Sequence, residues 1–310
     1  MRAVGVVVGN PVVDEVRRDA AFVRHATGGT ATYATLAMRA LGLDAALVGG
    51  AGHDHADMLR APLAAAGVDL CALRVVPDVA STAYLLDYEG EPPVRRVALL
   101  HRGPVIGTRE LPAPPARAAF VHVGPVACEV LPGAVEALAT WGVPLATDLH
   151  ALRRFSGEGA VRLGTGAETG SDFSLFDSVK GAVDEVLAFA PGADGVADAM
   201  RGIARLGVRH VFATDGRNGA LLLADDTIFE VPPFPVPVEV DATGAGDVFL
   251  AGFLFARFVR GEPSRDAALF GAAAASFVVE GPGTEVLGDE RAVDARRAAI
   301  GPTTRRRSCR

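Results

Sequence analysis

The chain has 310 residues, half of them hydrophobic, which is enough for one large α/β domain or two ordinary ones with a sizeable core. Its formal net charge of -7 argues against a general nucleic-acid binder, because proteins that follow phosphate backbones need a clustered basic surface. The dense basic run at 305–307 lies in a stretch, 302–310, that we expect to be a disordered, solvated tail. We therefore predict neither a nucleic-acid nor a membrane partner.

Cysteine usage and the lack of a long apolar run predict a cytoplasmic protein. Cys71, Cys128 and Cys309 are far apart and form no Cys-x-x-Cys pair, which predicts neither a disulfide framework nor a zinc site. The chain opens directly into the apolar run 4–8 without a charged leader. No uninterrupted apolar run approaches the ~20 residues that span a bilayer.

Short apolar runs bounded by glycine or proline alternate with amphipathic stretches along the chain. The runs are typical of strands buried on both faces, and they lie at 4–8, 45–48, 120–123, 143–147, around 179 and at 211–213. Helical spacing of apolar residues occurs at 33–41, 58–66, 131–141, 197–206 and 248–259. This alternation predicts an α/β fold with one open, mostly parallel sheet covered by helices on both faces, in a single domain over 1–310.

Two more polar segments, 14–26 and 81–101, interrupt this alternation. They carry alternating apolar residues and turn residues, so we interpret them as antiparallel strands outside the main sheet. We expect a small β lid over approximately 12–27 and 79–104 that closes over a ligand and excludes water. Ordinary edge hairpins are the alternative.

The most informative stretch is 238–249, which reads VEVDATGAGDVF. It predicts a short strand that leads into a helix with one apolar stripe. The turn Gly244-Ala245-Gly246 would then lie at a helix N-terminus, where unpaired N–H groups and the helix dipole bind an anion such as phosphate. Asp247, in the first turn, could accept a hydrogen bond from a substrate hydroxyl in line with that phosphate. The alternative is an acid that only stabilises the helix start.

Competing motifs are absent from the sequence. There is no Gly-x-x-x-x-Gly-Lys-[Ser/Thr] and no Gly-x-Gly-x-x-Gly after a strand. The sequence therefore supports neither a P-loop NTPase nor a dinucleotide dehydrogenase. Gly-x-Ser-x-Gly, the signature of α/β hydrolases, is also missing. The cluster His53-Asp54-His55 with Asp57 resembles a metal site, but we expect a surface loop in which Asp54 caps the following helix.

The stretch 241–247, followed by Phe249 and Gly252-Phe253, resembles the C-terminal signature of the ribokinase-like (PfkB) carbohydrate kinases. Other parts resemble the family in the expected order, namely 9–14, 28–29 with 34–42, 48–54, 63–69 and 214–220. The resemblance implies a ribokinase-like three-layer fold and ATP-dependent, magnesium-assisted phosphorylation of a hydroxyl on a small sugar or polyol. A homodimer formed through the lid would be compatible with it.

The resemblance also implies roles for individual residues. Asp247 would be the base, with the anion hole formed by Gly244, Ala245 and Gly246. The substrate would contact Asn10, Asp14, Gly28, Gly29, Arg102 and Arg154. The nucleotide would contact Thr214, Gly216, Gly219, Thr243, Gly244, Gly246 and Ala274, although close helix packing explains the small residues around Ala274 equally well. Glu185 would organise Mg²⁺ through water.

Two departures from the family pattern bear on the substrate. Ala182 replaces the asparagine of the Asn-x-x-Glu element, and Tyr33 stands where ribokinases carry a sugar-binding asparagine. Together with 147–154, 179–180, 184–185 and 231–234, these departures resemble the myo-inositol kinase branch. We therefore expect an inositol-like substrate. The alternatives are a kinase for a nucleoside, fructose, ribose or 2-keto-3-deoxygluconate, and a sugar-sensing regulatory protein without catalysis.

Overall fold

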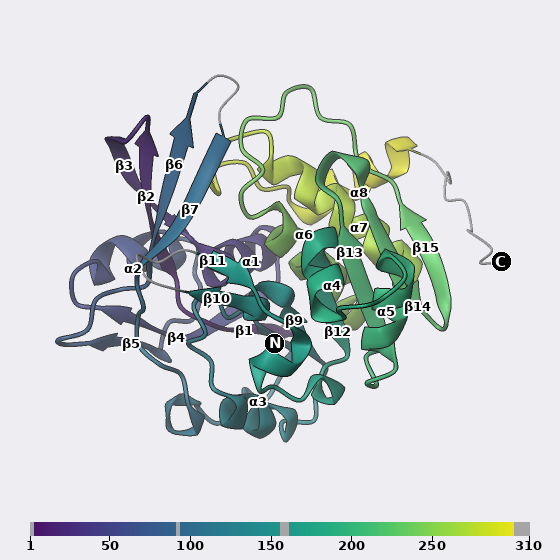
Figure 1. Ribbon diagram of the computed structural model, residues 1–310, viewed down its shortest axis with the longest axis horizontal. Helices are drawn as coiled ribbons and strands as arrows, with labels where there is room; N and C mark the ends of the chain where they lie inside the picture. The colour runs from purple at the N-terminus through teal and green to yellow at the C-terminus, as the bar shows by residue number, and fades with distance from the viewer. Residues whose placement is uncertain (1–2, 91–93, 156–160, 301–310) are drawn as a thin grey trace.

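The computed structural model describes residues 3–90, 94–155 and 161–300 (Figure 1). In this part of the chain nine strands form one sheet, in the order β15-β14-β13-β12-β9-β8-β1-β4-β5. They are β1 (Val4–Val8), β4 (Asp44–Gly52), β5 (Leu73–Val76), β8 (Ala118–Val123), β9 (Leu145–Asp148), β12 (Ser178–Ala182), β13 (His210–Thr214), β14 (Ala220–Ala224) and β15 (Thr227–Val231). The seven strands from β13 to β5 in this order run parallel, and β14 and β15 add an antiparallel edge. The predicted mostly parallel sheet is confirmed.

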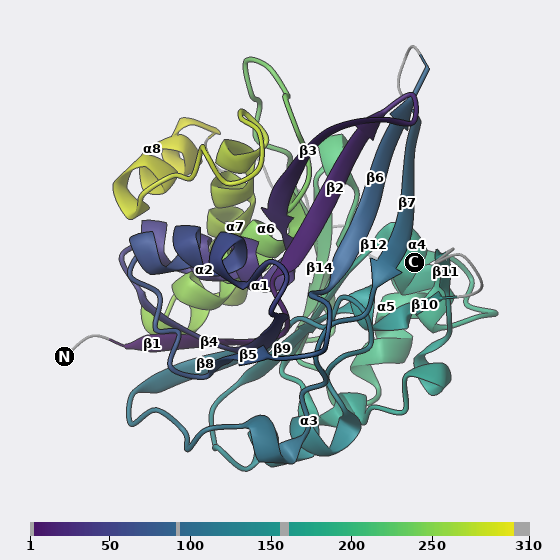
Figure 2. The same ribbon diagram turned by 90° about the vertical axis from the view of Figure 1, so that its left-hand side faces the viewer.

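Helices cover both faces of this sheet (Figure 2). They are α1 (Gly29–Ala40), α2 (Ala56–Ala65), α3 (Pro132–Ala139), α4 (Val183–Phe189), α5 (Val196–Ala204), α6 (Ala245–Leu254), α7 (Ser264–Val278) and α8 (Glu290–Ile300). Successive strand residues point to opposite faces, so Val7 packs in the core beneath α1, α6 and α7. Val6 and Val8 pack instead in the core that includes α3, α4 and α5. None of the described helices is both long enough and apolar enough to cross a membrane.

A second, four-stranded sheet has the order β3-β2-β6-β7 and projects from the main sheet (Figure 2). Its strands are β2 (Val12–Arg18), β3 (Ala21–Gly28), β6 (Ala83–Glu89) and β7 (Val94–His101). Two separated stretches of chain therefore form one sheet, at the places predicted for the lid. The pairing is mixed, because β2 runs parallel to β6 between two antiparallel hairpins, so the expectation of antiparallel strands alone is wrong. A further pair, β10 (Arg153–Phe155) with β11 (Val161–Leu163), forms a separate two-stranded sheet, and β11 contacts β7.

Asp54 ties the end of β4 to the entrance of the lid. Its Oδ1 accepts hydrogen bonds from the backbone N–H of Ser81 at 2.9 Å and from the Ser81 hydroxyl at 2.7 Å. The predicted role of Asp54 as the cap of α2 is wrong, because the N-cap residue is His55, which makes no side-chain cap. Burial alone would raise the pKa of Asp54, but the Ser81 hydrogen bonds outweigh it and the pKa is lowered.

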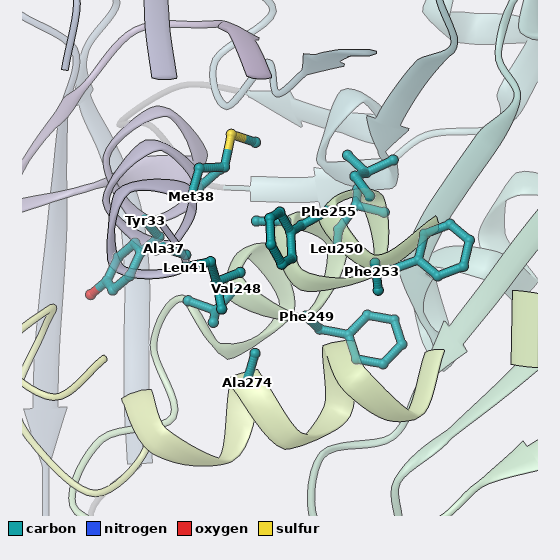
Figure 3. Close-up of a cluster of buried hydrophobic side chains, with 14 of the residues drawn as sticks. Tyr33, Ala37, Met38, Leu41, Val248, Phe249, Leu250, Phe253, Phe255 and Ala274 are labelled. Atoms are coloured by element: carbon teal, nitrogen blue, oxygen red, sulfur yellow. The ribbon is translucent and has the colours of Figure 1, made fainter. Parts of the chain in front are cut away.

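Helix α6 packs against α7 through glycine. A Cβ atom placed on Gly271 would lie 2.5 Å from the carbonyl oxygen of Phe249, and one on Gly252 would lie 3.0 Å from the Cα of Gly271. Figure 3 shows the ring of Phe249 of α6 lying over α7, and Ala274 of α7 pointing towards α6. The close approach of the two helices therefore holds α6, and with it the predicted phosphate-binding turn, in a defined position.

We expect Gly271→Ala to lower the free energy of unfolding by about 1–3 kcal/mol, because the added methyl group forces α6 and α7 apart. The matched control is Gly202→Ala in α5, where the nearest atom to an added Cβ is Ala190 Cβ at 3.8 Å. That control should leave stability unchanged or raise it by up to ~1 kcal/mol through helix propensity. Urea denaturation measures both, and equal effects would contradict glycine-dependent packing of α6.

Candidate active site

Helix α6 begins at the glycine turn, as predicted. Gly244 is its N-cap residue and has a left-handed backbone with φ of 79°. A Cβ on Gly244 would lie 2.2 Å from the ring of Tyr33, so only glycine fits there. The strand expected at 238–240 is absent, and the chain there is held by a backbone hydrogen bond from Val240 N–H to the Val279 carbonyl at 2.7 Å. The Ala245 N–H donates to the Ala242 carbonyl at 3.2 Å, so an anion at this helix start would be bound by the next N–H groups, those of Gly246 and Asp247.

A cavity of about 520 Å³ opens at this turn, between the lid, α1 and the carboxyl edge of the sheet. Its polar lining consists of Asp14, Thr30, Tyr33, Tyr84, His150, Lys180, Asp184, Glu185, Thr214, Thr243 and Asp247, with Gly29, Gly244 and Gly246 among its backbone walls. A neighbouring cavity of about 440 Å³ shares Asp14, Tyr33 and Thr243 with it. The two cavities therefore form one cleft beneath the lid.

Asp247 is buried beside this cavity, with 6% of its surface exposed. The Thr30 hydroxyl donates a hydrogen bond to its Oδ1 at 2.9 Å. Burial, reinforced by the nearby Asp148 carboxylate, raises the pKa of Asp247 to about 6, although Lys180 and the Thr30 hydrogen bond oppose the shift. At neutral pH the group is thus an ionised carboxylate that is more basic than an exposed aspartate, which suits a general base.

A buried ion pair lies next to Asp247. The Lys180 amine pairs with Oδ1 of Asp148, and the other oxygen of Asp148 lies 2.5 Å from His122 Nε2. Burial alone would lower the pKa of Lys180, but the Asp148, Asp247 and Glu185 carboxylates outweigh it and the pKa is raised. Burial alone would raise the pKa of Asp148, but Lys180 and His122 hold it well below its usual range. None of the three residues had a role assigned from sequence, although one signal was available: Lys180 is the chain's only lysine.

Glu185 and His150 form the opposite wall. Oε2 of Glu185 accepts a hydrogen bond from the Ala182 N–H at 2.9 Å, and its Oε1 lies 3.8 Å from His150 Nε2. One atom each of Asp148, His150 and Asp247 lie within 4.8 Å of one another. Because both oxygens of Asp148 are already engaged, these residues fit a Mg²⁺ ion that keeps most of its water and phosphate ligands, with Glu185 nearby, better than a closed protein cage.

The structure separates the predicted substrate residues into two groups. Asp14 and Gly29 line the cavity, whereas Asn10 does not. Asn10 is fully buried, where its side-chain amide donates to the Pro104 carbonyl at 2.8 Å and accepts from the Gly50 N–H at 2.8 Å. In this structure Asn10 joins the loop after β1 to Gly50 and Pro104, and its predicted substrate contact stays a prediction.

Gly28 bears on the predicted substrate site indirectly, by leaving room for the Asp14 carboxylate. A Cβ on Gly28 would lie 2.0 Å from Oδ2 of Asp14, so glycine is needed for this carboxylate to reach the start of α1. Arg102 is exposed and lines neither of the two cavities, so its predicted substrate contact stays a prediction. The side chain of Arg154, in β10, lies outside the described residues.

The predicted nucleotide residues are also only partly together. Thr214, Thr243, Gly244 and Gly246 line the cavity, and Gly216 and Gly219 form the exposed turn that follows Thr214 at the end of β13. Ala274 is buried instead, and a Cβ on Gly252 would lie 3.1 Å from its Cβ. Helix packing accounts for the small size of Ala274, and its predicted adenine contact stays a prediction.

The sequence was then compared with known proteins. Residues 1–290 match the model of the pfkB family of carbohydrate kinases. The chain belongs to this family. It is therefore a phosphotransferase with an alcohol group as acceptor, and its fold is ribokinase-like. These findings confirm the family, fold and enzyme class predicted from the sequence.

Individual relatives are similar over most of the chain. An inositol 3-kinase from Oryza sativa subsp. japonica is 34% identical over 291 residues, which cover 88% of this chain and 68% of that protein. A fructokinase from Klebsiella pneumoniae is 28% identical, over 85% of this chain and 87% of that enzyme. A pyrophosphate-dependent kinase in the ribokinase family, solved with a pyrophosphate analog and myo-inositol, superposes with a TM-score of 0.78 at 18% identity, covering 94% of this chain and 99% of that chain.

We expect Asp247→Asn to be more stable than the parent at pH 7.5, by about 1–3 kcal/mol. The pKa of Asp247 is raised from its ordinary value of 3.8 to about 6, so the folded protein binds the proton more tightly than the unfolded chain. The buried charge therefore lowers the free energy of unfolding of the parent protein above pH 6, and this destabilisation disappears as the pH falls towards 4. Urea denaturation at pH 7.5, 6.0 and 4.5 should show the difference shrinking in that order, whereas a variant less stable at pH 7.5 would contradict the buried-charge account.

Proposed function

We propose that this kinase transfers the terminal phosphate of ATP, with Mg²⁺, to a hydroxyl of a small cyclic polyol of the myo-inositol type. The observation that carries the proposal is the buried carboxylate of Asp247 in the first turn of α6, beside helix N–H groups that open into the cleft. A base and an anion site on one helix turn bring the acceptor oxygen and the phosphate together.

The proposed reaction is an in-line displacement at phosphorus. The acceptor hydroxyl donates its proton to Asp247 as its oxygen forms a bond to the terminal phosphorus, and the bond from that phosphorus to the ADP oxygen breaks. The N–H groups of Gly246 and Asp247 stabilise the negative charge on the transferring group. Magnesium, held through water by Glu185, would neutralise charge on the donor phosphates. Thr30 keeps the Asp247 carboxylate oriented through its 2.9 Å hydrogen bond.

The acceptor side of the cleft supports an uncharged polyol. Asp14 lies beneath the lid, where one carboxylate can accept hydrogen bonds from two neighbouring hydroxyls. The lid side chains that line the larger cavity beside Asp14, Tyr84, Leu86 and Val97, carry no charge, and the charged lid residue Arg24 lines the neighbouring cavity. The 34% identity to the rice inositol 3-kinase supports inositol in particular. On the outer strand of the lid, Phe22 is 58% exposed and Val23 is 54% exposed, which supports the further proposal that two copies pair through their lids.

A coupled ADP-release screen with Mg²⁺ tests this function across myo-inositol, ribose, fructose, 2-keto-3-deoxygluconate and common nucleosides. We expect the highest kcat/KM with myo-inositol. Asp247→Asn should bind ATP normally but lose a factor of several hundred or more in kcat, since a positioned base is removed. The matched control, Asp226→Asn, changes an exposed residue in the β14–β15 turn and should leave ATP binding and kcat unchanged. Near-normal turnover by Asp247→Asn on the best acceptor would show that Asp247 is not the general base.

We expect Gly28→Ala and Asp14→Asn to raise the acceptor KM by roughly tenfold or more, about 1.4 kcal/mol, while the KM for ATP stays within about twofold. Gly28→Ala should act by displacing the Asp14 carboxylate, which it would otherwise approach to 2.0 Å. Gly133→Ala in α3 is the control, because an added Cβ there meets nothing closer than Thr108 Oγ1 at 3.6 Å. If Gly28→Ala left the acceptor KM unchanged while Asp14→Asn raised it, the proposed support of Asp14 by Gly28 would fail.

A further inference from the structure

His122, Asp148 and Lys180 come from three neighbouring parallel strands and face the same side of the sheet. Lys180 of β12 pairs in register with Asp148 of β9, and His122 of β8 pairs with Ala146, two residues before Asp148. Ala146 itself lies in the apolar core beneath α1, α6 and α7, as does Phe120, two residues before His122. This face of the sheet therefore changes from apolar to charged at its carboxyl edge, next to the cavity at the start of α6.

Fold stability does not explain this arrangement. Asp148 and His122 are completely buried and Lys180 is 3% exposed, and apolar residues of similar size commonly stabilise a fold as well as a buried ion pair does. Nδ1 of His122 has no hydrogen-bond partner among the described residues, so the imidazole is anchored through its contact with Asp148 alone. An unpartnered buried polar atom costs free energy, which indicates a purpose other than packing.

The Lys180 amine lies against the backbone of the phosphate-binding turn. A Cβ on Gly246 would lie 2.8 Å from Nζ of Lys180, and both residues line the same cavity as Asp247. The surrounding carboxylates keep the amine charged, as its raised pKa indicates. A positive charge is thus fixed beside the N–H groups that would receive the transferring phosphate.

The composition of the chain supports a specific need for an amine here. Of the 30 lysine and arginine residues in the sequence, Lys180 is the single lysine. A Cβ on Gly246 would meet the Lys180 amine at 2.8 Å, so the amine already lies in close contact with the turn. A planar guanidinium is larger than an ammonium group and binds in a fixed fork, so arginine would not fit this position in the same way.

We propose that Lys180 is a catalytic residue that contacts the oxygens of the donor's terminal phosphate, and that Asp148 and His122 are positioning residues that hold its amine. The inference rests on the proposed phosphoryl transfer. Lys180 keeps its protons throughout, while the acceptor's proton goes to Asp247 and the donor's terminal P–O bond breaks. Its contribution is to balance the charge that spreads over the phosphoryl oxygens in the transition state.

Kinetics of matched variants test the two roles separately. Lys180→Met should lower kcat by about 10²–10³-fold, as expected for loss of one preorganised donor, with the acceptor KM unchanged within about threefold. Lys180→Arg should be impaired to a similar degree. His122→Leu should lower kcat by about tenfold, and His122→Gln, whose amide can still donate to Asp148, should recover most of it.

His210→Gln is the control for replacing a buried histidine. His210 begins β13, where Ser178 and Ser264 flank its ring, and its replacement should change stability but not kcat. If His122→Leu and His122→Gln lost activity equally, or if His210→Gln lost as much as His122→Leu, the positioning role of His122 would be overturned.

The single lysine also allows a direct measurement on the folded parent protein. Biosynthetic labelling with [¹³Cε]lysine gives one NMR signal, from Lys180, which can be titrated with the ATP analogue AMP-PNP and Mg²⁺, and separately with imidodiphosphate. We expect the signal to shift in step with donor binding measured by calorimetry. A shift with imidodiphosphate and not with AMP-PNP would support the proposed contact of Lys180 with the donor phosphate and would identify pyrophosphate as the donor.

Two negative outcomes are distinguishable. If a donor binds and phosphate is transferred while the Lys180 signal stays unchanged and Lys180→Met keeps its kcat, the contact is overturned and the kinase activity stands. If neither donor binds and no acceptor is phosphorylated, the proposed transfer itself fails and the inference fails with it.

Discussion

The start of α6 lies too close to its neighbours for a side chain at either glycine of the turn. Gly244 faces the ring of Tyr33 on α1, and Gly246 faces the amine of Lys180 on β12. This contact brings the helix N-terminus against the carboxyl edge of the sheet, the place where open α/β sheets bind ligands. Figure 3 shows the other side of the same constraint, with Tyr33 and Ala37 of α1 next to Val248 of α6 and the Tyr33 oxygen pointing away from the cluster. The core thus positions the backbone amides, and the cleft receives the polar ends.

The charged groups of the cleft lower the stability of the fold at a site that is suited to act on a ligand. Asp247, Asp148 and Glu185 bring three carboxylates to one buried region, and the Lys180 ammonium group lines the cavity with Asp247 and Glu185. Burial, and after it the nearby Asp148 carboxylate, disfavours the charged form of Asp247 in the folded state and raises its pKa. Proteins commonly concentrate such costs at sites that act on ligands, where perturbed acids and bases are useful.

The sequence predicted features that depend on local pattern. The apolar run at 4–8 is β1, and the glycine turn does begin a helix, because periodicity and glycine conformation are properties of neighbouring residues. The family signature predicted the same residues of the turn and the acid Asp14, both of which line the cleft. The mixed pairing of the lid was not predictable in this way, since it depends on which strands meet after a long crossover.

Contacts between residues far apart in the sequence were not predictable. Asn10 bonds to the backbone of Gly50 and Pro104, and Ala274 packs close to Gly252 of α6, although motif position alone predicted ligand contacts for both. Asp54, which was predicted to cap α2, bonds instead to Ser81, 27 residues away. The grouping of His122, Asp148 and Lys180 requires the register of three strands, which a local pattern does not contain.

The most direct measurement is a ³¹P NMR time course of the purified protein with ATP, Mg²⁺ and myo-inositol. If α6 delivers the terminal phosphate to a polyol hydroxyl, a phosphomonoester signal should grow in equal amount to the ADP formed. It should be absent when Asp247→Asn replaces the parent. Release of inorganic phosphate without a phosphomonoester, or an equal phosphomonoester yield from Asp247→Asn, would contradict the account.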